Sequence, residues 1–288
     1  MIIEDIASEI VLPNIRGVLA HELRNRGLSQ HRIAKILNIT QPLVHKLLRM
    51  PVEYYVENLK RYSIDEEIIT HQCRILADLA VSGSYARFVI TSHGFVSYLS
   101  AVIACREFVE LREECVKGLL KDPHIEVYKT MLSRIMAKPG LAKILPEVGS
   151  NLVYAPEPPN SEADIIGLTG RIVKTLTGIV ITGEPFYGGS RHLAKLLLII
   201  AKHNPSKKVG FNFKYDYSLV SRLDRKVYHV EHTGPHNDLN SFWRTMEEAA
   251  VRKPDVILDK GGTGLEPVTY VFTKDFYELE SILKSLLQ

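Results

Sequence analysis

The segment from residue 28 to residue 50 constrains the fold more than any other part of this chain. It carries the start signals, the turn signal and the apolar spacing of two short consecutive helices. Ser29 stands where the N-cap of the first helix is expected, and Thr40 stands at the same place before the second. Asn38 suits the turn between them, because asparagine tolerates a positive φ better than most residues. The pattern predicts a helix-turn-helix, whose second helix enters the major groove of DNA.

The second predicted helix carries the residues that would read DNA. Val44, Leu47 and Leu48 share one face and are expected to pack inward, which leaves a polar ridge exposed. Glutamine pairs with adenine and arginine with guanine, while lysine and arginine also bind phosphates. The expected DNA contacts are Ser29, Thr40, Gln41, His45, Lys46 and Arg49. The alternative is an ordinary helical hairpin with a solvated basic face.

Positive charge is concentrated on this segment. Residues 13–50 contain seven lysines and arginines and a single acid, Glu22, a net charge of +6. The whole chain has a net charge of only +3, so the remainder is acidic. This contrast favours a DNA-binding head, which needs cations for the phosphates of double-stranded DNA.

Length and composition favour a two-domain globular protein in the cytoplasm. The chain has 288 residues, of which 45% are hydrophobic and 24% charged. Its three cysteines lack CxxC spacing and are odd in number, which favours reduced thiols. The first residues are acidic, unlike a signal peptide, and the apolar run Leu196–Ala201 is too short to span a bilayer. We therefore expect no membrane partner.

The chain divides into three predicted parts. Residues 1–62 form the all-α helix-turn-helix domain, and residues 63–121 form a helical connector that is a candidate dimerisation region. The amphipathic segment 95–119 fits either packing on a second subunit or packing within the chain. A homodimer is expected because one isolated helix-turn-helix seldom gives enough specific affinity. Residues 122–288 form the third part.

This third part is predicted to be an α/β domain with a mixed or largely parallel sheet. Apolar runs of strand length alternate with helical patterns along it. The expected strands are 172–173, 178–182, 209–213, 226–230, 256–258 and 269–273, and the expected helices are 190–202, 241–251 and 275–287. Ligands of such sheets collect at strand ends and helix N-termini.

Three glycine-containing segments of this domain suit a phosphate ester. Residues 187–192 place two glycines, an expected N-cap at Ser190 and two cations at the start of a helix, where free N–H groups bind anions. Residues 259–267 hold three glycines with Asp259 and Glu266, which suit a metal ion on a diphosphate or a cationic ring. In residues 164–172, Arg171 can bind a phosphate in a fork. The alternatives are a plain strand-to-helix turn and a flexible loop.

A zinc site is the third class of interpretation. His229, His232 and His236 follow a His-x-x-His-x-x-x-His spacing that could hold zinc. However, they fall on a strand and a Gly-Pro turn, so surface histidines are the simpler interpretation. We expect no metal site.

Taken together, the segments resemble the ThiN-type thiamine-phosphate synthase domain, and specifically its fusion to a helix-turn-helix in archaeal ThiR-type regulators of thiamine genes. The order and spacing of several short matches make the resemblance specific, and it covers essentially the whole third part. The matching pieces are 145–148, 151–155, 163–164, 170–172, 184–186, Gly189, Ser190, His192, Ala194, Asn212, Tyr215, 254–255, Asp259, Gly264 and 266–267.

The resemblance implies a site for thiamine phosphate or thiamine diphosphate as effector, with no required cofactor and with Mg²⁺ accompanying a diphosphate. Enzymatic members join a pyrimidine methyl diphosphate to a thiazole phosphate and release diphosphate. In an active protein Arg171 and His192 would be the catalytic, anion-contacting pair. The implied ligand-binding residues are Arg171, Gly189, Ser190, Arg191, His192, Asn212, Lys214, Asp259, Gly261, Gly264 and Glu266.

Three departures from the family pattern bear on activity. Leu265 stands where the family has a lysine, Lys214 where it has an arginine, and Gly189 where it has an alanine. Loss of a cation weakens stabilisation of the leaving diphosphate, whereas product binding can survive. The sequence therefore predicts a ligand-responsive regulator, in particular a repressor, of thiamine biosynthesis or transport genes. The alternative is an active synthase with an attached DNA-binding arm.

Overall fold

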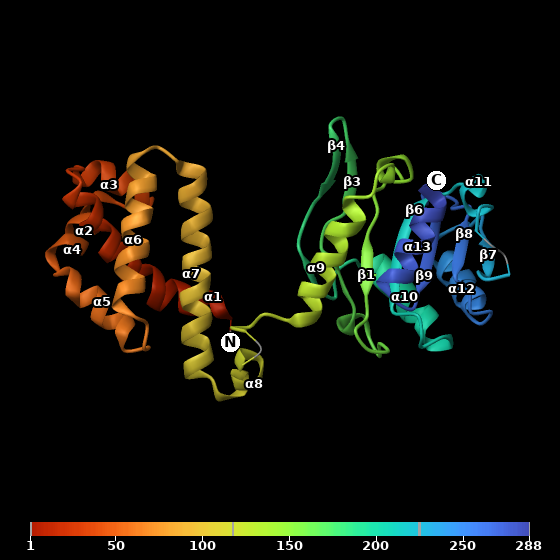
Figure 1. The fold of residues 1–288 in the computed structure, drawn as a ribbon, viewed down its shortest axis with the longest axis horizontal. Coiled ribbons are helices and arrows are strands. Elements are labelled where there is room, and N and C mark those ends of the chain that lie inside the picture. Colours follow the sequence, from red (N-terminus) through yellow and green to blue (C-terminus); the bar gives the residue numbers. More distant parts are fainter. Residues whose placement is uncertain (1, 117, 224–225, 288) are drawn as a thin grey trace. The chain divides into compact units, whose positions relative to one another are not determined.

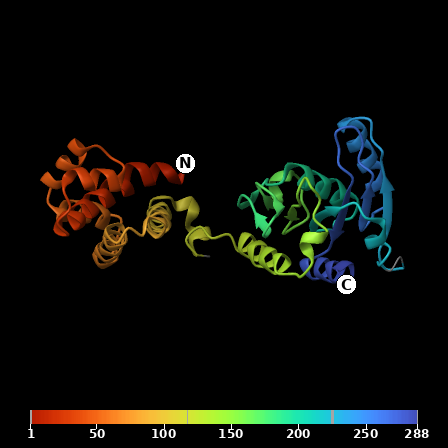
Figure 2. The same cartoon turned by 90° about the horizontal axis from the view of Figure 1, so that it is seen from above.

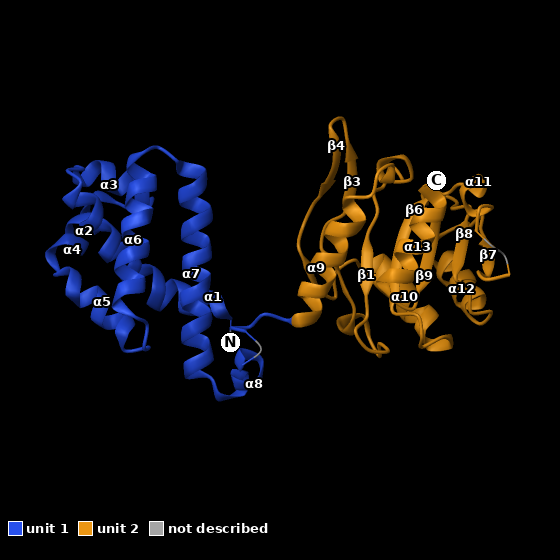
Figure 3. Cartoon of the chain, in the orientation of Figure 1, with its two compact units in different colours: residues 1–122 blue, residues 123–288 orange. Residues whose placement is uncertain are grey.

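The computed structural model describes residues 2–116, 118–223 and 226–287 and consists of two compact units. The first unit spans residues 1–122 and the second residues 123–288 (Figure 3). The first unit is all-helical, and the second is an α/β structure that begins with a helix (Figure 1). The predicted fold class is thereby confirmed, with a mixed sheet in the second unit.

The first unit is built from helices around one apolar core. Ile33, Val44, Leu59 and Leu76 are among its fully buried side chains. A π-helical turn, Ala7–Val11, joins the first two helices, and a 3-10 turn, Val109–Leu111, precedes the last. The α-helices are α1 (Ile3–Ile6), α2 (Leu12–Asn25), α3 (Gln30–Leu37), α4 (Gln41–Arg49), α5 (Val52–Lys60), α6 (Glu66–Val81), α7 (Tyr85–Glu107) and α8 (Arg112–Val116).

The amphipathic segment predicted over 95–119 is not one continuous helix. Helix α7 begins ten residues earlier and ends at Glu107, where Phe108 is extended, and Lys117 lies outside the described residues. A disulfide joins Cys105 to Cys115, so the chain must turn back between them. The prediction of reduced thiols is therefore wrong for this pair. Cys73 is free and buried, and burial raises the pKa of its thiol to about 12.

Within the described part of the chain, α7 is the one helix long and apolar enough to cross a membrane by length and composition. The sequence prediction considered only uninterrupted apolar runs and missed it. Phe95, Leu99 and Ile103 of α7 belong to the core of the first unit. Its outer face carries the exposed Tyr85 and Ile90.

The second unit contains a seven-stranded sheet in the order β5-β2-β1-β6-β9-β8-β7. Neighbouring strands are antiparallel except for the parallel pair β7 and β8, so the sheet is mixed rather than largely parallel. A two-stranded ribbon, β3 and β4, extends from it (Figure 1). The strands are β1 (Leu152–Tyr154), β2 (Ile166–Leu168), β3 (Ile172–Thr175), β4 (Gly178–Ile181), β5 (Pro185–Tyr187), β6 (Val209–Lys214), β7 (Val230–Thr233), β8 (Val256–Asp259) and β9 (Val268–Thr273).

Helices cover both faces of this sheet. Alternating β6 and β9 residues point to opposite sides, as a strand period of two requires. Phe211 and Val271 pack in one core with α9 (Pro123–Met136) and α13 (Phe276–Leu287), and Tyr270 and Phe272 pack in the other with α10 (Arg191–His203) and α12 (Leu239–Ala250). Figure 2 shows α9 and the C-terminal helix together on one side of the sheet. A short helix, α11 (Tyr217–Val220), follows β6, and 3-10 turns occupy Leu141–Lys143 and Glu162–Asp164.

Candidate functional site

The predicted helix-turn-helix forms from α3 and α4. The Ser29 hydroxyl accepts a hydrogen bond from the backbone N–H of Arg32, and the Thr40 hydroxyl accepts one from Leu43. Asn38 ends α3 in the left-handed conformation, with φ at 49° and ψ at 50°. Both caps and the turn therefore act as their residue types predict.

The outer face of α4 is open to solvent. Gln41, His45, Lys46 and Arg49 are all exposed, whereas Val44 is buried, as are Leu47 and, in part, Leu48. No sequence pattern singles out Tyr55, whose hydroxyl donates a 2.8 Å hydrogen bond to the carbonyl of Leu47 and fixes the end of α4. The helix thus presents a polar and basic ridge on a rigid support.

The second unit contains a cavity of about 970 Å³ at the N-terminal ends of α10 and α12. Nine of the eleven residues predicted to bind ligand line it, although they come from segments almost a hundred residues apart. They are Arg171, Gly189, Ser190, Arg191, His192, Asn212, Asp259, Gly264 and Glu266. The cavity is large enough for a small organic ligand.

The start of α10 supplies the anion-binding end of this cavity. Residues 188–192 line it, and the first N–H groups of a helix have no partner within that helix. Ser190 is the N-cap in a left-handed conformation, with φ at 57°, and its hydroxyl makes no capping hydrogen bond. The expectation that Ser190 caps the helix through its side chain is wrong, because the left-handed backbone turns that side chain away from the helix N–H groups. Its N–H neighbours remain available to an anion.

Gly189 is required for close approach of two backbone segments. A Cβ atom added at Gly189 would lie 2.1 Å from the carbonyl oxygen of Gly167 on β2. The alanine that the family has at this position therefore has no room here, and Gly189 allows the loop before α10 to lie against β2.

Two polar side chains form hydrogen bonds that hold residues 147–151, most of which line the cavity. The Asn212 side-chain oxygen accepts a 2.7 Å hydrogen bond from the backbone N–H of Asn151, and Asn212 Nδ2 donates to the carbonyl of Gly149. The Glu266 carboxylate accepts hydrogen bonds of 3.1 and 2.9 Å from the N–H groups of Glu147 and Val148. Asn212 and Glu266 therefore shape the cavity wall.

Arg171 is another cationic side chain of the cavity. It is exposed, and its guanidinium donates to the carbonyl of Val148 while it lines the cavity. A guanidinium has five N–H donors, so this contact leaves most of them for an anion.

Asp259 is part of a buried polar cluster at the end of β8. Its Oδ1 accepts a 2.8 Å hydrogen bond from the Thr233 hydroxyl and a 2.6 Å hydrogen bond from His236 Nε2. The Asp259 and His236 side chains are each 1% exposed. The cluster fixes a carboxylate in the cavity wall.

His192 lies against aromatic rings. Its ring centroid is 5.0 Å from those of Phe242 and Trp243, and Nε2 is 3.1 Å from the Tyr270 hydroxyl. Desolvation lowers the pKa of His192, opposed by the charge of Asp259 and reinforced by nearby cations. Burial raises the pKa of Tyr270, which therefore keeps its proton. At neutral pH the imidazole is held neutral.

Two predicted ligand residues do not line the cavity. The Lys214 ammonium lies 3.6 Å from Asp216 at the end of β6. Gly261, at a φ of 68°, shapes the loop, since a Cβ there would lie 2.3 Å from the carbonyl oxygen of Leu265. Sequence reasoning missed the α10–α12 wall made by Lys195, Phe242 and Trp243, together with Tyr270.

The three histidines of the zinc interpretation do not converge. His229 pairs with Glu231 at 2.9 Å, the His232 ring lies 6.2 Å from that of Tyr217, and His236 is buried against Asp259. Within residues 2–116, 118–223 and 226–287, no group of three metal-binding side chains is placed to hold an ion.

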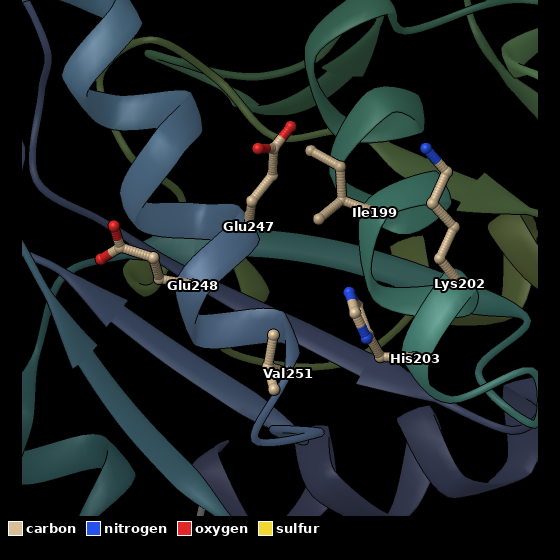
Figure 4. Close-up of a pocket in the computed structure, with 6 residues that line it drawn as sticks. All are labelled: Ile199, Lys202, His203, Glu247, Glu248 and Val251. Atoms are coloured by element: carbon tan, nitrogen blue, oxygen red, sulfur yellow. The ribbon is translucent and has the colours of Figure 1, made fainter.

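A smaller hollow of about 360 Å³ lies at the C-terminal ends of the same two helices. Figure 4 shows Lys202 and His203 on α10 and Glu247 and Glu248 on α12, with the Glu248 carboxylate directed away from α10. Long charged side chains of both signs fill its rim, which is typical of a solvated helix seam.

The fold and cavity define an α/β unit that can hold a small anionic, ring-containing ligand. The family described as Thiamine-phosphate synthase ThiN matches residues 128–285, more than half of the chain, and the chain belongs to this family. The first unit lies outside that match.

The chain is also similar to two curated proteins and to one solved structure. The bifunctional thiamine biosynthesis protein ThiDN of Methanocaldococcus jannaschii is 37% identical over an alignment of 150 residues, and the match covers 47% of this chain and 34% of that protein. The thiamine-phosphate synthase ThiN of Methanothermobacter thermautotrophicus is 26% identical over an alignment of 175 residues, and the match covers 57% of this chain and 92% of that one. The crystal structure of the C-terminal domain of a phosphomethylpyrimidine kinase is 24% identical, with a TM-score of 0.48, and the match covers 55% of this chain and 94% of that one. This chain thus spans about a third of the length of the first relative.

Proposed function

We propose that this protein is a repressor of thiamine biosynthesis or transport genes, whose helical unit binds double-stranded DNA and whose ThiN unit binds thiamine phosphate or thiamine diphosphate. One observation carries the regulatory part of the proposal. The exposed ridge of Gln41, His45, Lys46 and Arg49 stands on a helix-turn-helix with both caps formed, in the same chain as a ThiN unit.

The cavity supports a thiamine ester as the effector. The start of α10 with Arg191 suits the phosphate, and the aromatic wall beside His192 suits a flat heteroaromatic ring. Asp259 and Glu266 already accept hydrogen bonds from protein groups, so Mg²⁺ enters the proposal only as the companion of a diphosphate.

Binding to DNA from upstream of thiamine genes, measured with and without thiamine phosphate at one salt concentration, tests the proposal. We expect tight, sequence-dependent binding that changes when the ligand is added. Specific binding that no thiamine ester alters would refute the regulatory coupling. Absence of specific DNA binding would refute the role of the helical unit.

The second candidate function is catalysis of thiamine-phosphate synthesis, and the family and curated relatives favour it directly. In that reaction the thiazole nitrogen bonds to the pyrimidine methylene carbon while the carbon–oxygen bond to diphosphate breaks. The protein must position both substrates and stabilise the departing anion. Arg171, Arg191 and Lys195 all line the cavity and can supply that positive charge, with His192 as a neutral hydrogen-bonding partner.

Turnover of the two precursors separates the two candidates. A pure regulator binds the product without forming it, whereas a synthase releases diphosphate in step with thiamine phosphate. Arg171→Ala provides the control, because it removes one cavity cation without touching the buried clusters. Turnover at ordinary enzymatic rates that depends on Arg171 would make the synthase the principal function.

We further propose that the protein acts as a homodimer in the cytoplasm. A two-fold DNA site needs two reading heads, and α7 exposes the large side chains of Tyr85, Val89, Ile90 and Tyr98, with Arg87 among them, to a second copy. Light scattering checks this proposal. We expect the unaltered protein to be a dimer and the Ile90→Glu variant to shift toward monomer. A monomeric unaltered protein would refute it.

A further inference from the structure

The cavity has a second recognition element besides its anion-binding end, formed where α10 and α12 lie side by side. Lys195 of α10 places its ammonium 4.1 Å from the centroid of the Trp243 ring on α12. Phe242 supports this ring from the core side, edge to face at 4.9 Å, and is 1% exposed. Trp243 itself is half-buried at the cavity wall. The indole is thus held in a fixed orientation with one face in contact with a cation.

This face attracts positive charge for a physical reason. The π-electrons of an indole give its face a negative potential, and tryptophan is the strongest such partner among the side chains. Lysine is a flexible side chain with a single point charge, so it can leave the ring without disturbing α10. A flat ring that carries a positive charge could replace the ammonium and also gain contact area.

The two ends of the cavity together specify a ligand of one kind. The start of α10 suits a phosphate, and Lys195 lies one helical turn further on, so the indole borders the same space. A ligand that fits both ends has a phosphate at one end and a cationic heteroaromatic ring near it. Thiamine phosphate has this form, because its thiazolium ring is permanently positive and carries the phosphate-bearing arm.

We propose that the indole face of Trp243 binds the positively charged thiazolium ring of thiamine phosphate in place of the Lys195 ammonium, and that this contact makes the site prefer the cationic product to the neutral thiazole phosphate. The inference rests on the proposed binding of thiamine phosphate and adds the residue that selects the charged ring. The neutral thiazole phosphate carries the same phosphate but cannot replace a cation on the indole. The phosphate end alone cannot distinguish the two.

The chain offers a direct assay, because Trp243 is its only tryptophan. Thiamine phosphate should quench the tryptophan fluorescence of the full-length protein, and inorganic phosphate should not. Calorimetry on the Trp243→Leu variant should show a loss of about 10- to 30-fold in affinity for thiamine phosphate. The affinity for thiazole phosphate should change much less. Trp243→Phe should fall between the two, since phenylalanine keeps a weaker aromatic face.

Tyr277→Leu is the matched control. Tyr277 lies on α13 with the Arg134 guanidinium 5.8 Å from its ring centroid, so its loss removes a cation–aromatic pair of the same unit outside the cavity. It should leave both affinities unchanged, and far-UV circular dichroism checks that each variant is folded.

The outcomes separate this inference from the function on which it rests. If thiamine phosphate binds with the same affinity to Trp243→Leu, or without quenching in the unaltered protein, the indole contact is refuted while the ligand proposal stands. Equal losses for thiamine phosphate and thiazole phosphate would refute charge selection. If the unaltered protein binds no thiamine phosphate at all, the proposed function fails first.

Discussion

The buried carboxylate of Asp259 should contribute strongly to the stability of the second unit. Two donors, the Thr233 hydroxyl and His236 Nε2, bond to the same oxygen, and both Asp259 and His236 are almost fully buried. Hydrogen bonds to a charged group contribute about 1.5–3 kcal/mol each, so we expect Asp259→Ala to lower the free energy of unfolding by about 3–5 kcal/mol. Asp259→Asn keeps an acceptor oxygen, and its loss should be about 1–2 kcal/mol.

Urea unfolding followed by tryptophan fluorescence measures this effect in the relevant unit. Trp243, the only tryptophan, belongs to the second unit, so the signal reports the unfolding of that unit. Glu247→Gln on the exposed side of α12 is the control and should change the free energy by less than about 0.5 kcal/mol. A loss below about 1 kcal/mol for Asp259→Ala would refute the reasoning, because burial of two unpaired donors must cost more.

Three further predictions concern the other parts of the molecule. Lys46→Ala should weaken binding to all DNA sequences and reduce the slope of log affinity against log salt concentration by about 1. Arg49→Ala should cost about 1–3 kcal/mol of binding free energy at the one base pair where Arg49 reads guanine. Mobility shifts at several salt concentrations measure both effects, and no change in either variant would contradict a role for α4. The pKa of His192 is lowered by desolvation, so the neutral form favours folding. The stabilisation by the neutral imidazole is present above the unfolded pKa of about 6.5 and is lost as the pH falls through the pKa of His192 in the folded protein. Urea titrations should therefore show that the free energy of unfolding depends less on pH in this range for His192→Gln than for the unaltered protein. The Ser150 hydroxyl is buried and has no hydrogen-bond partner among the residues that the structure describes, so Ser150→Ala should raise the thermal midpoint, and a fall would show that a partner exists.

The sequence could predict the elements with strong local signals. Ser29, Asn38 and Thr40 each have a backbone preference that acts within four residues, so the helix-turn-helix formed as expected. The strand predicted over 226–230 is observed at Val230–Thr233 instead, because pairing with β8 determines it. Strands β1, β2 and β5 have three residues each, too few to show a period of two. The glycine-containing segments held eight of the nine predicted residues that line the cavity, since backbone geometry there requires glycine or a helix start, and the ninth, Asn212, came from the family resemblance.

The aromatic wall could not be predicted, and the reason concerns the geometry of α12. Phe242 and Trp243 are adjacent in sequence, and a helix turns by about 100° between neighbours, so one ring enters the core while the next reaches the cavity. The rotation of α12 against α10 decides which of the two rings reaches the cavity, and only tertiary packing fixes that rotation. The role of Lys195 also depends on tertiary packing. The sequence alone predicts a solvated helix residue, whereas the contact of its ammonium with the Trp243 ring shows that this ring face can bind a cation. The proposed contact for a cationic ring therefore arises between two helices, whereas the proposed anion-binding end lies within a single loop and the start of one helix.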